Sequence, residues 1–96
     1  MTEDTLETAR RRLRMRSMRR GIKEMDLILS TFADERLGDM DAEALHHYET
    51  MLSENDQLLY RWVSGQEDAP DDYAALIADI AAVTKDRSIR LRTGRI

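Results

Sequence analysis

The side chains of this chain that could do chemistry are two histidines, His46 and His47, many carboxylates, and an arginine-rich stretch between Ala9 and Arg20. Adjacent histidines in a helix point about 100° apart, whereas a shared metal ion needs a spacing of three or four residues. No pair of carboxylates is marked out for acid–base catalysis, and the chain has no cysteine. It also has no glycine-rich phosphate loop and no nucleophile motif. The sequence therefore predicts no catalytic, metal-binding or cofactor-binding residues.

Charge is distributed unevenly along the chain, although the net charge is only −4. Residues 1–23 carry eight basic and three acidic side chains (+5), residues 24–84 carry two and fifteen (−13), and residues 85–96 carry five and one (+4). Because the acidic body repels phosphate, a nucleic-acid site could lie only at the ends. The stretch ARRRLRMRSMRR has three interpretations: a solvated basic face paired with the acidic body, a docking surface for an acidic partner, or a nucleic-acid contact without aromatic residues to stack bases.

Apolar periodicity predicts five helices that would position these groups, over residues 5–20, 22–37, 41–52, 53–63 and 71–85. Gly21 is expected as the left-handed residue that ends the first helix. Asp41 is expected to be the N-cap of the third helix, and Ser53 with Asp56 a capping box for the fourth. The side chains expected to face inward are mostly aliphatic or aromatic: Leu6, Ala9, Leu13, Ile22, Met25, Ile28 or Leu29, Phe32, Leu45, Tyr48, Leu52, Leu58, Leu59, Trp62, Val63, Tyr73, Leu76, Ile77, Ile80, and Val83 or Ala81.

The predicted fold class is all-α, a compact five-helix bundle with a frayed basic C-terminal tail. We expect residues 1–15 to form an arginine-rich N-terminal helix extension, residues 16–85 a single helical-bundle domain, and residues 86–96 a flexible basic tail. No apolar run approaches the roughly 18 residues that a membrane helix needs, so no direct membrane insertion is expected. The acidic, polar start of the chain favours a bacterial cytoplasmic location.

The stretch RRGIKEMD, from Arg19 to Asp26, has a local explanation as a helix end followed by a helix start. Two features also favour an interface. Arg20 and Glu24 flank Gly21 within one turn, which places a forked donor and an acceptor on the same edge. The missing Cβ of Gly21 would let another backbone come close.

Taken with the downstream YETMLSENDQLLYRWVSG, this stretch resembles the SdhE-type (YgfY-like) flavinylation factors of succinate dehydrogenase. Their R-G-x-x-E motif is matched by Arg20, Gly21 and Glu24, and its common extension by Asp26. Their D-x-x-L-x-x-W block is matched from Asp56 to Trp62. The resemblance covers residues 16–82.

The resemblance implies a five-helix bundle that is not an enzyme. It implies binding to the flavoprotein subunit of succinate dehydrogenase or fumarate reductase, and promotion of covalent FAD attachment to a histidine of that subunit. Arg20, Gly21 and Glu24 would contact this partner, with Arg19 and Asp26 beside them. FAD would belong to the partner, and the free chain would be a monomer or a weak dimer.

Two alternatives belong to other classes of protein. Small all-α chorismate mutases also begin with an arginine-rich helix, but they need one long unbroken first helix, and Gly21 would lie in its middle at a cost of about 1 kcal/mol. A basic-armed nucleic-acid-binding adaptor is the second alternative, and it predicts binding that weakens steeply with salt. With the flavinylation factor as the main hypothesis, we expect no nucleic-acid partner.

Overall fold

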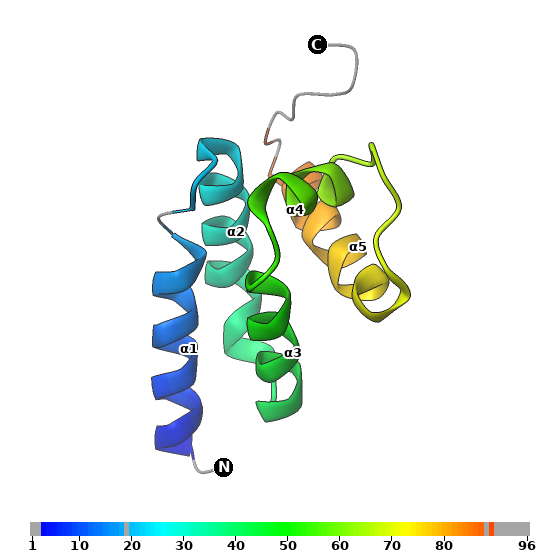
Figure 1. The fold of residues 1–96 in the computed structure, drawn as a ribbon. Coiled ribbons are helices and arrows are strands. Elements are labelled where there is room, and N and C mark those ends of the chain that lie inside the picture. The colour runs from blue at the N-terminus through cyan, green and yellow to red at the C-terminus, as the bar shows by residue number, and fades with distance from the viewer. Residues whose placement is uncertain (1–2, 19, 88, 90–96) are drawn as a thin grey trace.

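The computed structural model describes residues 3–18, 20–87 and 89. These residues form five α-helices, one 3-10 turn and no strand (Figure 1). In chain order the elements are α1 (Glu3–Ser17), α2 (Lys23–Arg36), η1 (Leu37–Asp39), α3 (Ala42–Leu52), α4 (Asp56–Val63) and α5 (Asp71–Asp86). The all-α five-helix bundle predicted from the sequence is confirmed.

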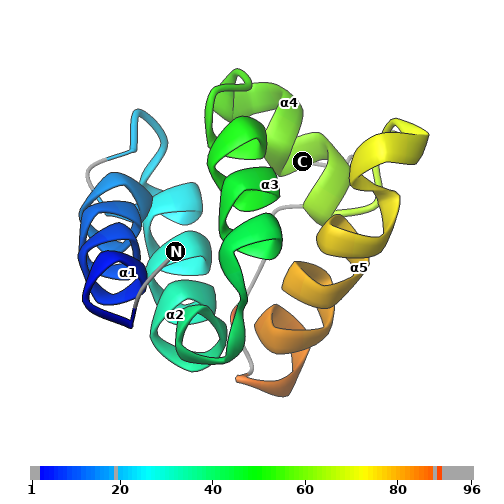
Figure 2. The same cartoon turned by 90° about the horizontal axis from the view of Figure 1, so that it is seen from below.

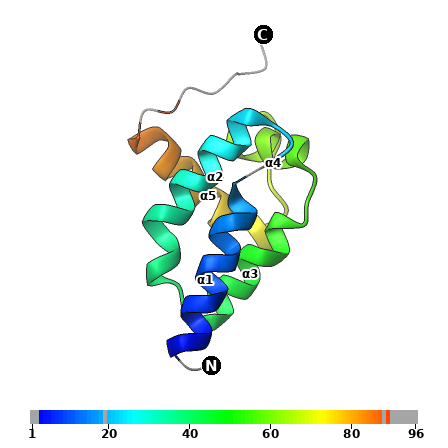
Figure 3. The same ribbon diagram turned by 90° about the vertical axis from the view of Figure 1, so that its left-hand side faces the viewer.

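The helices pack as two groups that share α2. Helix α1 packs against α2 and α3, and α2 also packs against α4 and α5. Figure 2, seen from below, shows α1 at one side of the molecule and α5 at the other. Figure 3 shows α1 lying in front of α2 and α3. The short connections between α1, α2 and α3 thus place the end of α1 beside the start of α2.

One apolar core joins all five helices. Its buried members come from the faces that periodicity predicted, and they include Leu13 of α1, Phe32 of α2 and Ile80 of α5. The rings of Phe32 and Tyr48 lie 5.6 Å apart between centroids at its centre. Burying each large apolar side chain contributes about 1.5–3 kcal/mol. Because α1 continues through residue 15 and Leu13 belongs to this core, the described part of the expected N-terminal extension packs as the first helix of the bundle.

The ends of the first two helices differ from those expected. Helix α1 ends at Ser17 rather than at Arg20, and α2 begins at Lys23. Among the described glycines only Gly65 has a positive φ, so the left-handed conformation expected at Gly21 is wrong. The break between α1 and α2 is nevertheless real, and it removes the long first helix that the chorismate-mutase alternative requires.

Asp41 is confirmed as the N-cap of α3, because its Oδ1 accepts a hydrogen bond from the backbone N–H of Ala44 at 2.8 Å. The capping box expected at Ser53 and Asp56 is wrong. Asn55 caps α4 instead, accepting from the N–H of Gln57 at 2.8 Å. Asn55 thus satisfies one of the orphan N–H groups at the start of α4. The carboxylate of Asp56, which a capping box would have turned back to the N–H of Ser53, is available for another contact.

The expected C-terminal tail lies mostly outside the described residues. Helix α5 continues to Asp86, and the next residue, Arg87, forms an ion pair with Glu35 of α2. Ile89 packs against the core. Among the helices described, none combines the length and apolar character needed to cross a membrane.

A buried hydroxyl pair joins the end of α1 to α3. The hydroxyls of Ser17 and Tyr48 lie 2.7 Å apart, and Ser17 donates its proton to the carbonyl of Leu13 at 2.7 Å. Because that proton is engaged with Leu13, the neutral hydroxyl of Tyr48 donates to Ser17, whereas a Tyr48 phenolate would accept from Ser17. Burial raises the pKa of Tyr48 to about 12, against opposing effects of the Ser17 hydrogen bond and the nearby Arg20 charge.

This raised pKa predicts a loss of stability in alkali. The folded pKa of Tyr48 lies above its ordinary value of 10.0, so its contribution is complete below pH 10 and is lost as the pH rises towards 12. We expect Tyr48→Phe to cost about 1 kcal/mol at pH 7, the value of one hydrogen bond. Between pH 10 and 12 the stability of the wild type should fall by about 2 kcal/mol more than that of the variant. Urea unfolding of both proteins at each pH measures this difference, and parallel pH curves would contradict it.

Candidate docking surface

Arg20 is held by three different parts of the chain. Its Nε donates to Oδ1 of Asp56 at 2.8 Å, and its Nη2 forms an ion pair with the same oxygen at 2.6 Å. Nη2 also donates to the carbonyl of Leu52 at 3.0 Å, and Nη1 donates to the carbonyl of Arg16 at 3.4 Å. These carbonyls belong to the last turns of α3 and α1, where a cation is favoured. Only 12% of the Arg20 side chain and 17% of the Asp56 side chain are exposed.

Gly21 is exposed, and its backbone contacts the same carboxylate. Its N–H donates to Oδ2 of Asp56 at 2.6 Å. A Cβ added to Gly21 would lie 3.1 Å from this oxygen, closer than most real Cβ contacts. The missing Cβ therefore permits a close approach, as the sequence predicted, but the group that approaches within this chain is Asp56.

The other predicted site residues lie on the first turns of α2 or outside the described residues. Glu24 and Asp26 are half-buried in this part of α2, where carboxylates complement the helix dipole. Arg19 lies outside the described residues. The structure thus brings Arg20 and Gly21 together at Asp56 and places Glu24 one turn away, with the fork of Arg20 turned into the protein. That these residues contact a partner stays a prediction.

Three exposed apolar side chains flank this motif, and the sequence reasoning did not single them out as a surface. Met15 is 52% exposed, Met18 47% and Leu27 53%, and these are the large hydrophobic residues found exposed among those described. Leu27 lies between the buried positions Met25 and Ile28, so the helical period alone places it off the core face. We call Met15, Met18 and residues 20–27 the α1–α2 corner. Exposed methionine and leucine side chains beside polar groups are typical of protein interaction sites.

Three arginines of α1 form hydrogen bonds or ion pairs with other parts of this chain. Arg10 is buried and donates to the carbonyls of Leu37 and Met40, both at 2.9 Å. It therefore satisfies carbonyl groups of the segment that follows α2. Arg12 and Arg16 both form ion pairs with Glu49 of α3. The hydrogen bond from Arg12 lowers the pKa of Glu49. These contacts support the interpretation of a basic face paired with the acidic body, and they leave Arg11 exposed.

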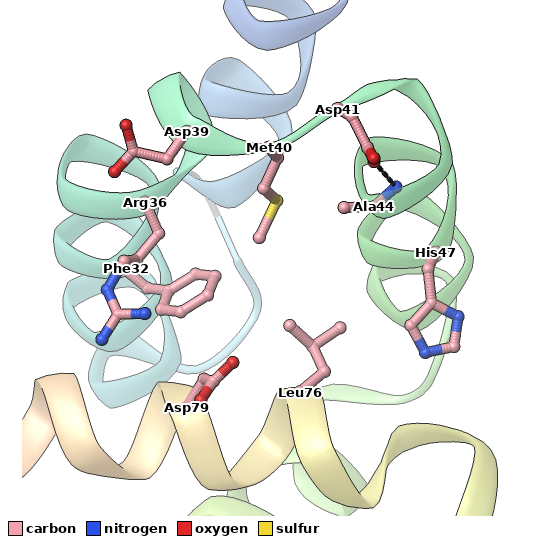
Figure 4. Close-up of a pocket in the computed structure, with 9 residues that line it drawn as sticks. All are labelled: Phe32, Arg36, Asp39, Met40, Asp41, Ala44, His47, Leu76 and Asp79. Carbon is pink, nitrogen blue, oxygen red and sulfur yellow. Dashed lines mark hydrogen bonds between the residues drawn. The ribbon is translucent and has the colours of Figure 1, made fainter.

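A groove of about 440 Å³ lies at the other end of the bundle, between α2, α3 and α5 (Figure 4). Phe32, Met40 and Leu76 line it with apolar surface, and Figure 4 shows the side chain of Met40 projecting into the space between Phe32 and Leu76. Three carboxylates and one guanidinium surround this lining, from Asp39, Asp41, Asp79 and Arg36. The sequence did not predict it, because its residues come from distant segments.

The residues of this groove do not fit FAD. A dinucleotide carries a pyrophosphate, which proteins bind with backbone N–H groups at glycine-rich turns or with cations. Here Asp39, Asp41 and Asp79 outnumber the single cation Arg36, so the local charge repels phosphate. Within the described residues, no cluster of three or more His, Cys, Asp or Glu side chains could hold a metal ion.

The fold and the α1–α2 corner together define a small helical bundle with exposed apolar side chains beside the motif. Its particular family follows from comparison with known proteins. A family model described as flavinator of succinate dehydrogenase matches residues 11–84, and the chain belongs to this family. The family's description and the names of the relatives are those of assembly factors, and this agrees with the expectation that the chain is not an enzyme.

Similar proteins carry names that agree with this family. The chain is 49% identical over 70 residues to the mitochondrial succinate dehydrogenase assembly factor 2 of Aspergillus terreus, and 39% identical over 72 residues to that of Schizosaccharomyces japonicus. It is 34% identical over 91 residues to the mitochondrial assembly factor 2-B of Drosophila mojavensis. These alignments cover 73%, 75% and 93% of this chain but only 23%, 50% and 58% of the relatives. The chain thus spans less than two thirds of each relative's length.

These names correct the expected location. We expected a bacterial cytoplasmic protein, but the relatives from fungi and flies are named as mitochondrial proteins. The expectation rested on the acidic start of the chain, and such a composition does not report on the compartment in which a family works.

Proposed function

We propose that this chain promotes covalent attachment of FAD to a histidine of the flavoprotein subunit of succinate dehydrogenase, or of the related fumarate reductase, by binding that subunit through the α1–α2 corner. The names of its relatives indicate that it does so in mitochondria. The observation that carries the proposal is the match of residues 11–84 to the flavinator family, because this range contains the whole corner.

The local structure supports the corner as the contact surface. Gly21 leaves its backbone exposed, and Glu24 lies one turn further along α2. Met18 and Leu27 add exposed apolar surface on either side of them. An interface commonly combines a few apolar anchors with polar groups that select the partner, and this corner offers both.

The proposed mechanism requires no reacting atom from this chain. The new bond would form inside the flavoprotein, between its own histidine and its flavin. A helper that binds the aligned arrangement of these groups more tightly than the open one shifts the population towards the aligned form. The gain in rate is then limited by the difference between the two affinities.

FAD itself is proposed to remain with the partner. The acidic surroundings of the groove at Asp39, Asp41 and Asp79 do not suit a pyrophosphate. No nucleic-acid partner and no stable self-association beyond a weak dimer are proposed. Equilibrium dialysis of FAD against the purified chain tests whether this chain binds FAD by itself.

The test of the proposed function is covalent flavin in the recombinant flavoprotein subunit, measured by fluorescence in a denaturing gel with and without this chain. The wild type is expected to raise the covalent flavin. Glu24→Ala is expected to lower the affinity for the subunit by about tenfold, since a hydrogen bond to a charged group contributes about 1.5–3 kcal/mol.

Glu43→Ala is the matched control, because Glu43 lies in the first turn of α3 as Glu24 does in α2, but away from the corner. Each substitution loses a similar favourable interaction with a helix dipole. Equal covalent flavin with and without the wild-type chain would refute the proposed function. Equal losses for both variants would refute the assignment of Glu24.

A further inference from the structure

Asp56 connects the two segments of the chain that carry the family resemblance. It is the first residue of α4 and opens the block that ends at Trp62. Its carboxylate accepts hydrogen bonds from Arg20 through Oδ1 and from the backbone of Gly21 through Oδ2. One side chain therefore holds both the arginine and the glycine of the motif, although it follows them by more than thirty positions.

The position of Asp56 suits this contact. A carboxylate in the first turn of a helix is stabilised by the helix dipole, and its own cap, Asn55, satisfies the N–H of Gln57. Both of its oxygens are thus free to bind outside α4. The 2.6 Å hydrogen bond to Gly21 favours a glycine there, because a Cβ would lie 3.1 Å from Oδ2 and the carboxylate would have to move back by a few tenths of an ångström.

Among the described residues of the connection between α1 and α2, Arg20 and Gly21 make the hydrogen bonds to distant helices, while Ile22 packs partly against the core. Met18 donates its N–H within α1, to the carbonyls of Arg14 and Met15. Ile22, the N-cap residue of α2, makes no side-chain capping hydrogen bond. The hydrogen bonds that tie Arg20 and Gly21 to the more distant helices go to Asp56 and to the neighbouring carbonyl of Leu52.

We propose that Asp56 is a positioning residue for the α1–α2 corner. By holding Arg20 and Gly21, it sets the backbone path into α2 and hence the place of Glu24 and Leu27 relative to the bundle. Asp56 acts through these residues and need not touch the flavoprotein. This inference rests on the proposed function, because it concerns the same docking surface.

The experiment compares Asp56→Asn with the wild type as full chains. Asparagine has the same shape, but it loses the charge and one of the two acceptor oxygens. We expect the affinity for the recombinant flavoprotein subunit, measured by calorimetry, to fall roughly tenfold. Binding is measured well below the unfolding temperature of each variant, so that a loss of global stability does not reduce it.

Glu49→Gln is the matched control. Glu49 of α3 also pairs with two arginines of α1, Arg12 and Arg16, and neither arginine is one of the residues of the corner. Its affinity for the subunit should equal that of the wild type. A role of Asp56 that is merely structural would lower the unfolding temperature and leave the affinity unchanged.

Coupling to Glu24 distinguishes positioning from an independent contact. If Asp56 acts through the corner, Asp56→Asn combined with Glu24→Ala should bind no more weakly than the worse of the two single variants. Additive losses, or an affinity of Asp56→Asn equal to that of the wild type, would overturn the inference while leaving the proposed function intact. Failure of the wild-type chain to bind the subunit would overturn the proposed function and this inference with it.

Discussion

Replacing Arg20 by alanine is expected to lower the free energy of unfolding by about 2 to 3 kcal/mol. The substitution removes the cation from the carboxylate of Asp56, whose side chain is only 17% exposed in the wild type. It also removes the donor that satisfies the carbonyl of Leu52. The cost is smaller than for a fully buried pair, because both side chains keep some contact with water. For a domain of this size, Tm should fall by about 10 to 20 °C, measured by circular dichroism.

Arg11→Ala is the control for this prediction. Arg11 is exposed on α1, and its replacement removes the same charge from the chain. Its stability should stay within about 0.5 kcal/mol of the wild type. An unchanged Tm for Arg20→Ala would mean that the contacts to Asp56 and Leu52 add nothing beyond what water supplies. Arg20 would then have to be explained by the partner alone.

Leu27→Asp is expected to reduce binding to the flavoprotein subunit by roughly 30-fold or more, with a parallel loss of covalent flavin. The substitution removes apolar surface from the proposed interface and places an unpaired carboxylate in it, which is costly to desolvate. The fold should persist, because Leu27 is 53% exposed on the free protein. Its helix propensity changes by only about 0.5 kcal/mol.

Ala78→Asp provides the matched control, since it adds the same charge at an exposed position of α5. It should bind and promote flavinylation like the wild type. If both variants lose binding equally, net charge governs the association and the corner is not its site. If Leu27→Asp binds normally, the exposed apolar residues beside the motif serve no docking role.

The helices and their inward faces could be predicted because both depend on local patterns. In its own helix, each of Leu13, Phe32 and Ile80 is spaced from other apolar residues at the helical period. Each is buried on the face that this period predicted. Asp41 was recognisable as a cap because an N-cap side chain binds an N–H only two or three residues away. The residues that form such signals lie close together along the chain, so the signals can be recognised without knowledge of the tertiary structure.

Helix ends were harder to predict where distant groups compete for the backbone. Arg19 and Arg20 suited the last turn of a helix, yet α1 ends at Ser17. There the side chain of Ser17 binds back to Leu13 and meets the hydroxyl of Tyr48. Gly21 does not adopt the left-handed conformation of a residue that ends a helix. Its N–H is satisfied instead by the carboxylate of Asp56 from α4.

The sequence by itself determined the all-α class, the helical core faces and the family to which the chain belongs. It also identified Arg20, Gly21 and Glu24 as a group, because they are close neighbours along the chain. Only the tertiary structure decided what Arg20 and Gly21 bind. Packing of α4 against α2 brings Asp56 to the connection after α1, and a hydrogen bond between segments so far apart leaves no periodic or local signal in the sequence.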